Sequence, residues 1–186
     1  MRDAFSGALV ATLKALHPAG PPAVKPRLIL LGDVLDLSLG TPQDALAAFD
    51  ALVKSLADAG ARDWLGPFAF LPGNHDHELW TVTRFQRMAA PAPGAGDAPF
   101  RHTTPAFADP GTEPKAALLD EIVRRHGFEG VTTLYPNMGL VTGDGKRVVM
   151  LHHGHFVEAA YHAMSSLTAA LEGGATSPGT PRRSNG

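Results

Sequence analysis

The sequence contains no cysteine, so it has neither a disulfide framework nor a thiolate metal site. Any metal ion must therefore be held by His, Asp, Glu or Asn side chains. The sequence also lacks a run of about 18 apolar residues, the length that a membrane-spanning helix needs. Lys14 interrupts the apolar N-terminal segment, which therefore does not resemble a secretory signal. These absences predict a cytoplasmic protein without a membrane span.

Charge of one sign is also lacking, because 16 Lys and Arg face 18 Asp and Glu and the net charge is −2. This balance argues against a nucleic-acid surface built on general basicity. The 186 residues, 44% of them hydrophobic, suit one domain with a full core. Glycine and proline gather in two stretches. We expect residues 89–112 to form a long lid-like loop and residues 173–186 a disordered tail behind a domain over 1–172.

The apolar pattern predicts alternating strands and helices. Leu28–Leu31 and Phe68–Leu71 are short apolar runs typical of buried strands. Thr41 and Pro42 suit the N-cap and the first position of a helix that Gly60 ends. Two further helices are predicted over 4–16 and 156–171. A third begins after residue 76, with Leu79, Val82, Phe85 and Met88 on one face, and a fourth begins after a cap at Thr112. Further predicted strands cover 131–134 and a hairpin over 140–151.

Polar clusters follow three of the predicted strands. They are Gly32-Asp33-Val34-Leu35-Asp36, Pro72-Gly73-Asn74-His75-Asp76 and His152-His153-Gly154-His155. Each contains a glycine, which lets the backbone turn sharply, and ligands bind at the carboxyl ends of strands in open α/β sheets. A lone Gly-Asp or Asn-His-Asp would be an ordinary turn. Three such clusters after three strands indicate a functional site.

The clusters together offer carboxylate, amide oxygen and imidazole. This mixed set suits Mn, Fe, Zn or Ni, whereas an all-oxygen set would suit Mg or Ca. Two such ions about 3.5–4 Å apart can activate a water molecule and neutralise a phosphoryl transition state. The choice of histidine in the last cluster stays open at this point, because His152, His153 and His155 compete for one role.

These motifs resemble the calcineurin-like metallophosphoesterases, whose pattern runs D-x-H, G-D-x-x-D, G-N-H-D/E, a His often followed by Gly, and G-H-x-H. Gly32–Asp36 matches the second motif, Gly73–Asp76 the third and His153-Gly154 the fourth. The resemblance covers roughly residues 5–170. It implies an α/β fold with two facing sheets flanked by helices (α/β/β/α), which we expect to be incomplete at both ends.

The resemblance also implies a role for each matching residue. Asp33 would bridge two divalent ions, expected to be Mn2+ with Fe, Zn or Ni as alternatives, and Asn74 and His153 would be further ligands. His75 would protonate the leaving group. Asp76 would orient the His75 ring. Asp36 and His155 would support these residues from behind.

Two motifs of the family are missing. Asp3-Ala4-Phe5 has phenylalanine where D-x-H needs an imidazole, and only His162 follows His155 as a potential ligand for the closing motif. We therefore expect an internal piece of a longer protein, or a misassigned start and an early end, with weak or no activity in this chain alone.

The expected function is metal-dependent hydrolysis of a small phosphoester. One alternative is a non-catalytic scaffold of the same fold that binds a partner protein, against which the intact His75 argues. Another is a nucleotide phosphodiesterase or nuclease of the family, although the near-neutral charge makes long nucleic acid the poorer substrate.

Overall fold

The computed structural model describes residues 2–37, 40–89 and 115–155 of the chain. It forms two compact units, Met1–His153 and Gly154–Gly186, and all the helices and strands described below belong to the first. The predicted loop beyond residue 89, the predicted helix over 156–171 and the predicted tail lie outside the described residues, as does the predicted domain boundary at residue 172.

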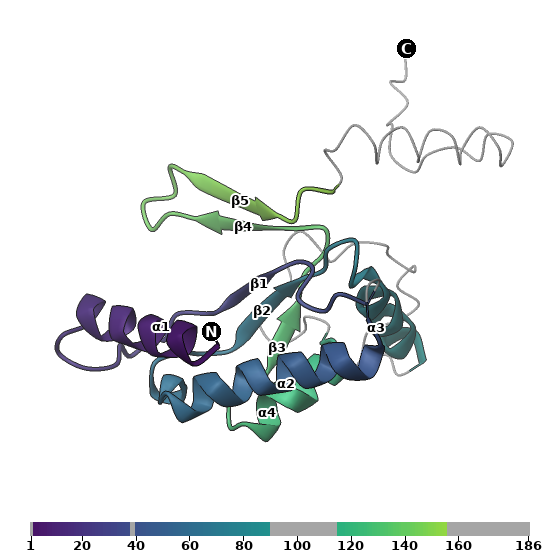
Figure 1. The fold of residues 1–186 in the computed structure, drawn as a ribbon. Helices are drawn as coiled ribbons and strands as arrows, with labels where there is room; N and C mark the ends of the chain where they lie inside the picture. The colour runs from purple at the N-terminus through teal and green to yellow at the C-terminus, as the bar shows by residue number, and fades with distance from the viewer. Residues whose placement is uncertain (1, 38–39, 90–114, 156–186) are drawn as a thin grey trace, which may run out of the picture. The chain divides into compact units, whose positions relative to one another are not determined.

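A parallel sheet of three strands lies at the centre of the first unit, in the order β1-β2-β3 (Figure 1). The strands are β1 (Ile29–Leu31), β2 (Phe68–Leu71) and β3 (Val131–Thr133). All four residues of β2 have no exposed surface, as a central strand covered on both faces requires. The outer strand β1 was also expected to be covered on both faces, but Leu31 is 41% exposed. That difference follows from its position at one end of the described sheet.

Helices α1 (Arg2–Leu16), α2 (Pro42–Asp58) and α4 (Ala117–Arg125) contribute much of the core, together with a short 3-10 helix, η1 (Ala61–Asp63), and residues of the loops. The core joins residues of these helices to the sheet: Val10, Leu13, Phe49, Val53, Leu56, Leu65, Phe68, Phe70, Leu119, Ile122, Val123 and Val131. None of the helices in the described part of the chain is both long and apolar enough to cross a membrane.

The start of α2 confirms the capping prediction. Thr41 is the N-cap, its hydroxyl accepts a hydrogen bond from the backbone N of Asp44 at 3.2 Å, and Pro42 stands in the first turn. At the other end, Gly60 has φ 82°, a left-handed conformation that glycine adopts at little cost. One face of α2 packs inward, with Phe49, Val53 and Leu56 buried.

The inner face predicted for the helix after residue 76 was wrong in part. Helix α3 (His77–Ala89) buries Leu79, Trp80 and Thr83, whereas Val82 and Phe85, both assigned to the inner face, are 41% and 60% exposed. The stacking of Trp80 on a buried ring outside the helix, described below, turns this face inward. Helix α4 is described from Ala117 with Ala116 as its N-cap, and the predicted cap at Thr112 lies outside the described residues.

The predicted hairpin is present as β4 (Asn137–Val141) and β5 (Val148–His152), which pair antiparallel. Its turn is closed by a hydrogen bond from Thr142 N to Arg147 O at 2.9 Å, and Gly145 has φ 69°. His152 pairs with Asn137, which follows the end of β3 by four residues. The hairpin therefore brings the histidine cluster back beside the segment that leaves β3. The α/β architecture with a parallel sheet and helices agrees with the predicted fold class.

Candidate active site

The first two polar clusters leave the sheet side by side because of the strand register. Leu31 of β1 pairs with Leu71 of β2, so Gly32-Asp33 and Pro72-Gly73 follow neighbouring positions of parallel strands. The backbones approach so closely that a Cβ built on Gly73 would lie 2.2 Å from Asp33 Oδ1 and 2.7 Å from Asp33 N. Only glycine fits there. The pairing register therefore brings the second and third motifs into direct contact.

Asp33 links the two loops and adopts an unusual backbone conformation. Its φ is 49°, in the left-handed region that few non-glycine residues occupy, and Gly32 before it has φ 74°. Asp33 Oδ1 accepts a hydrogen bond from the backbone N of His75 at 3.0 Å. Strained residues persist where the surroundings determine them strongly, and they gather at functional sites.

The other oxygen of Asp33 meets the third cluster. Asp33 Oδ2 lies 3.1 Å from His153 Nε2, and the two side chains are 31% and 20% exposed. A Cβ on Gly32 would lie 2.2 Å from His153 Cδ2, so this glycine makes room for the ring. Among the three competing histidines, the structure brings His153 to Asp33. His152 is exposed on β5, and His155 belongs to the second unit, so its supporting role stays a prediction.

The ring of His75 is held by a carboxylate other than the expected one. His75 Nδ1 lies 3.0 Å from Asp36 Oδ1, in a pair that is 34% and 41% exposed. Asp76 was expected to orient this ring, but both of its oxygens bond to the backbone instead. The reason is the direction of the chain: Asp76 turns inward at the start of α3, while the Gly32–Asp36 loop brings Asp36 to the ring.

Asp76 is a buried clamp between the two loops. It has no exposed surface, and its Oδ1 accepts from Gly73 N at 2.7 Å while Oδ2 accepts from Val34 N at 2.8 Å and Leu35 N at 3.4 Å. Burial raises the pKa of Asp76 and the nearby charge of Asp33 adds to this, whereas the three N–H donors oppose the rise. The clamp fixes the Gly32–Asp36 loop against the Pro72–Asp76 loop.

The donor chemistry fits a divalent ion in part. Asp33 Oδ2 and His153 Nε2 are separated by 3.1 Å, as expected of two ligands that each lie roughly 2 Å from one ion. Asn74, between Gly73 and His75 in the sequence, is exposed, and its amide oxygen can bind an ion without adding charge. Within residues 2–37, 40–89 and 115–155, however, no three His, Asp or Glu side chains form a complete metal cluster.

Asp3, the carboxylate of the incomplete first motif, is engaged elsewhere. Its Oδ1 accepts a hydrogen bond from Ser55 Oγ at 2.9 Å, which ties α1 to α2. Ser6 and Ser55 are buried at this contact, 2.8 Å apart. Asp3 therefore serves helix packing and adds nothing to the site.

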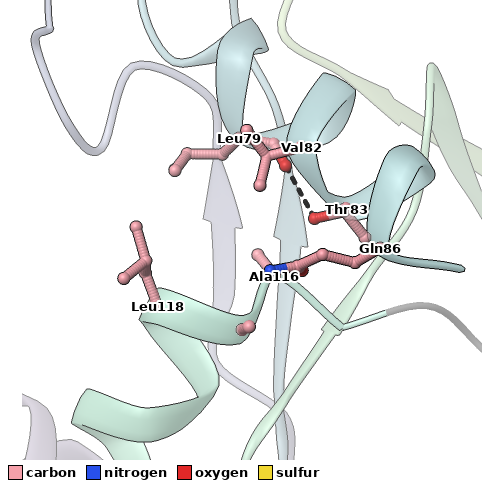
Figure 2. Close-up of a pocket in the computed structure, with 7 residues that line it drawn as sticks. Leu79, Val82, Thr83, Gln86, Ala116 and Leu118 are labelled. Carbon is pink, nitrogen blue, oxygen red and sulfur yellow. Dashed lines mark hydrogen bonds between the residues drawn. The ribbon is translucent and has the colours of Figure 1, made fainter. Parts of the chain in front are cut away.

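A small hollow lies between α3 and the start of α4, lined mostly by apolar side chains (Figure 2). It is lined by Leu79, Val82, Thr83, Gln86, Ala116, Ala117 and Leu118. The Thr83 hydroxyl donates to Leu79 O at 2.6 Å. None of the described residues that line this hollow carries a carboxylate or an imidazole, in contrast to the loops around Asp33.

The sequence prediction missed one aromatic group next to the site. Tyr135 was not singled out by the sequence, and its hydroxyl lies 3.2 Å from Nε2 of His77. The available signal was weak, since His77 directly follows the Pro72–Asp76 loop while Tyr135 lies 58 residues away in the chain.

The fold and the site define a class: an α/β protein whose strand-end loops gather carboxylate, amide and imidazole groups for metal-dependent chemistry. The comparisons give the family. The chain matches the family model "Calcineurin-like phosphoesterase" over residues 6–170 and belongs to that family. The resemblance found in the sequence is thereby confirmed. No curated protein and no solved structure gave a significant match. The family supports a metal-dependent phosphoesterase in general, acting on phosphoester substrates with divalent metal ions.

Proposed function

We propose that this protein hydrolyses a small phosphoester at a dinuclear metal site formed around Asp33. The observation that carries the proposal is the pair of contacts made by this one carboxylate. Asp33 Oδ2 meets the ring of His153, and Asp33 Oδ1 holds the backbone of His75. A metal ligand and a proton donor are thus fixed relative to each other through one side chain.

In this proposal Asp33, Asn74 and His153 hold divalent metal, with Mn2+ the expected ion. The bound metal would supply a Lewis acid for the phosphoryl oxygens and a polarised water molecule as nucleophile. Asp33 would be the carboxylate shared by both ions, with Oδ2 beside His153 and Oδ1 accepting from the backbone N of His75.

His75 is the proposed general acid. Its Nδ1 lies 3.0 Å from Oδ1 of Asp36, and this contact holds the ring in place. The other ring nitrogen can then give its proton to the leaving oxygen of the substrate. Asp36 thus takes the orienting role once assigned to Asp76. Asp76 keeps the two loops together.

The test is hydrolysis of a generic aryl phosphodiester and an aryl phosphomonoester with and without Mn2+, alongside direct measurement of Mn2+ binding. The chain is expected to bind Mn2+ and to turn over at least one ester at a low rate, because the first and last motifs of the family are missing from its sequence. His75→Ala should keep Mn2+ and lose turnover by about 10²–10⁴-fold, the usual contribution of a general acid. Asp33→Asn should lose both.

Two alternatives predict other results. A scaffold of the same fold, which binds a partner protein, would show no turnover in the intact chain and no dependence on His75. A nucleotide phosphodiesterase or nuclease of the family would prefer nucleotide diesters over aryl esters, and the net charge of −2 favours short nucleotides over long nucleic acid. Unchanged turnover in both His75→Ala and Asp33→Asn would reject the proposed site. A cytoplasmic location is part of the proposal.

A further inference from the structure

Tyr135 lies at a buried junction beside the proposed site. Its side chain is 3% exposed, and its hydroxyl shares a hydrogen bond of 3.2 Å with His77 Nε2. The His77 ring meets the tyrosine edge-on at a centroid distance of 5.2 Å, and Trp80 stacks on the tyrosine at 5.3 Å with an interplanar angle of 19°. His77 and Trp80, both at the start of α3, therefore pack against Tyr135.

The backbone on both sides of Tyr135 is also fixed. Leu134 N donates to Phe70 O at 2.9 Å, which continues the pairing of β3 with β2 by one residue. Two residues after Tyr135, Asn137 pairs with His152, the neighbour of His153. Tyr135 thus stands between the sheet and the hairpin that carries the proposed metal ligand.

His77 is the first residue of α3 and lies two positions after His75. A rigid contact at His77 therefore restricts where the Pro72–Asp76 loop can place the His75 ring. Aromatic side chains give large contact areas at a low entropy cost, and a buried hydroxyl with a partner fixes their direction. Small displacements of a catalytic group can lower turnover greatly, by as much as about 10²-fold for 1 Å.

We propose that Tyr135 is a positioning residue, which acts through His77 to hold His75 at its working distance from the Asp33–His153 pair. The inference rests on the proposed function for its catalytic consequence. The order that Tyr135 imposes on the loop does not depend on the reaction.

The test uses Tyr135→Phe, which removes the hydroxyl and keeps the stack on Trp80. Thr83→Val is the matched control. It also removes a buried hydroxyl, but this one lies in α3 and bonds within that helix, to Leu79 O. Two readouts are measured in the full chain. The first is kcat and KM with Mn2+, alone and combined with His75→Ala. The second is hydrogen exchange at the His75 amide, which bonds to Asp33 Oδ1.

Tyr135→Phe is expected to lower kcat by about threefold to thirtyfold, with KM within about twofold. It is also expected to speed hydrogen exchange at the His75 amide by a similar factor, the size that the loss of one hydrogen bond allows. Thr83→Val should change neither. In the His75→Ala background, Tyr135→Phe should bring no further loss of kcat, because the group that it positions is gone. His77→Phe, which removes the same hydrogen bond from the other side, should match Tyr135→Phe.

Unchanged kcat and unchanged exchange in Tyr135→Phe would overturn the inference, and so would a loss of kcat that persists in full without His75. If His75→Ala itself keeps full turnover, the proposed function fails. Amide exchange alone then decides the inference: faster exchange in Tyr135→Phe but not in Thr83→Val supports it, and equal exchange overturns it.

Discussion

Asp36 Oδ1 lies 3.0 Å from Nδ1 of His75, across 39 residues of sequence. The neighbouring carboxylate, Asp76, faces away from that ring and accepts three backbone N–H groups. The two aspartates that end the second and third motifs thus divide the work. One faces the proposed proton donor, and the other joins the loops that carry it.

The first prediction concerns this contact. Asp36→Asn removes the charge beside the His75 ring and is expected to lower kcat by about tenfold to a hundredfold, part of the roughly 10²–10⁴-fold that a general acid contributes. Mn2+ binding should stay unchanged, since the proposed role of Asp36 is to orient the His75 ring and not to hold metal. Steady-state kinetics at saturating Mn2+ checks this. Asp63→Asn, an exposed change in η1, is the control, and equal kcat in the two variants would contradict the role of Asp36.

The second prediction separates the histidines of the last cluster. His153→Ala is expected to weaken Mn2+ binding by at least about tenfold to a hundredfold, a loss that even supporting residues produce. His152→Ala should leave it unchanged, because His152 is exposed on β5 while His153 lies 3.1 Å from Asp33. Calorimetric titration with Mn2+ measures both. Equal losses in the two variants would show that the wrong histidine has been assigned.

The third prediction concerns stability. Asp76→Ala leaves three buried N–H groups without an acceptor and is expected to lower the free energy of unfolding by about 2–4 kcal/mol. Asp63→Ala should change it by no more than about 0.5 kcal/mol, as is usual at exposed positions. Urea unfolding of both variants gives the comparison. A change for Asp76→Ala as small as that for Asp63→Ala would mean that the clamp does not hold the loops.

The fourth prediction is a pH effect in the hairpin turn. The Thr142 hydroxyl, and then the backbone N of Lys146, hold the pKa of Asp144 below its ordinary value of 3.8. A carboxyl whose pKa is lower in the folded state stabilises the fold above pH 3.8, and that stabilisation is lost as the pH falls through the folded-state pKa.

Thr142→Val removes the larger cause, so its Tm should fall further below that of the unmodified protein above pH 4 than at lower pH. The hydrogen bond that the Thr142 hydroxyl accepts from Arg147 N is lost at every pH, so a smaller, constant difference should remain. Thermal unfolding between about pH 2 and pH 6 measures the difference. A Tm difference that stays constant over this range would show that Asp144 is not involved.

Local sequence determined the elements and the motifs. The capping of α2 by Thr41, the end of that helix at Gly60, the buried strand β2 and the β4–β5 hairpin all follow from turn chemistry and from apolar periodicity, which act over a few residues. The motif spacing likewise indicated the family. These features need no knowledge of distant contacts.

Tertiary structure decided which side chains meet. The register of Leu31 with Leu71 sets the Gly32–Asp36 loop beside Gly73. In this placement Asp36 contacts the His75 ring, and Asp76 accepts hydrogen bonds from the backbone. Periodicity alone assigned Val82 and Phe85 to the inner face of α3. The stacking of Trp80 on Tyr135 instead turns Trp80 inward and leaves Val82 and Phe85 exposed. Strand register and ring stacking join residues far apart in the chain, so no local pattern could reveal them.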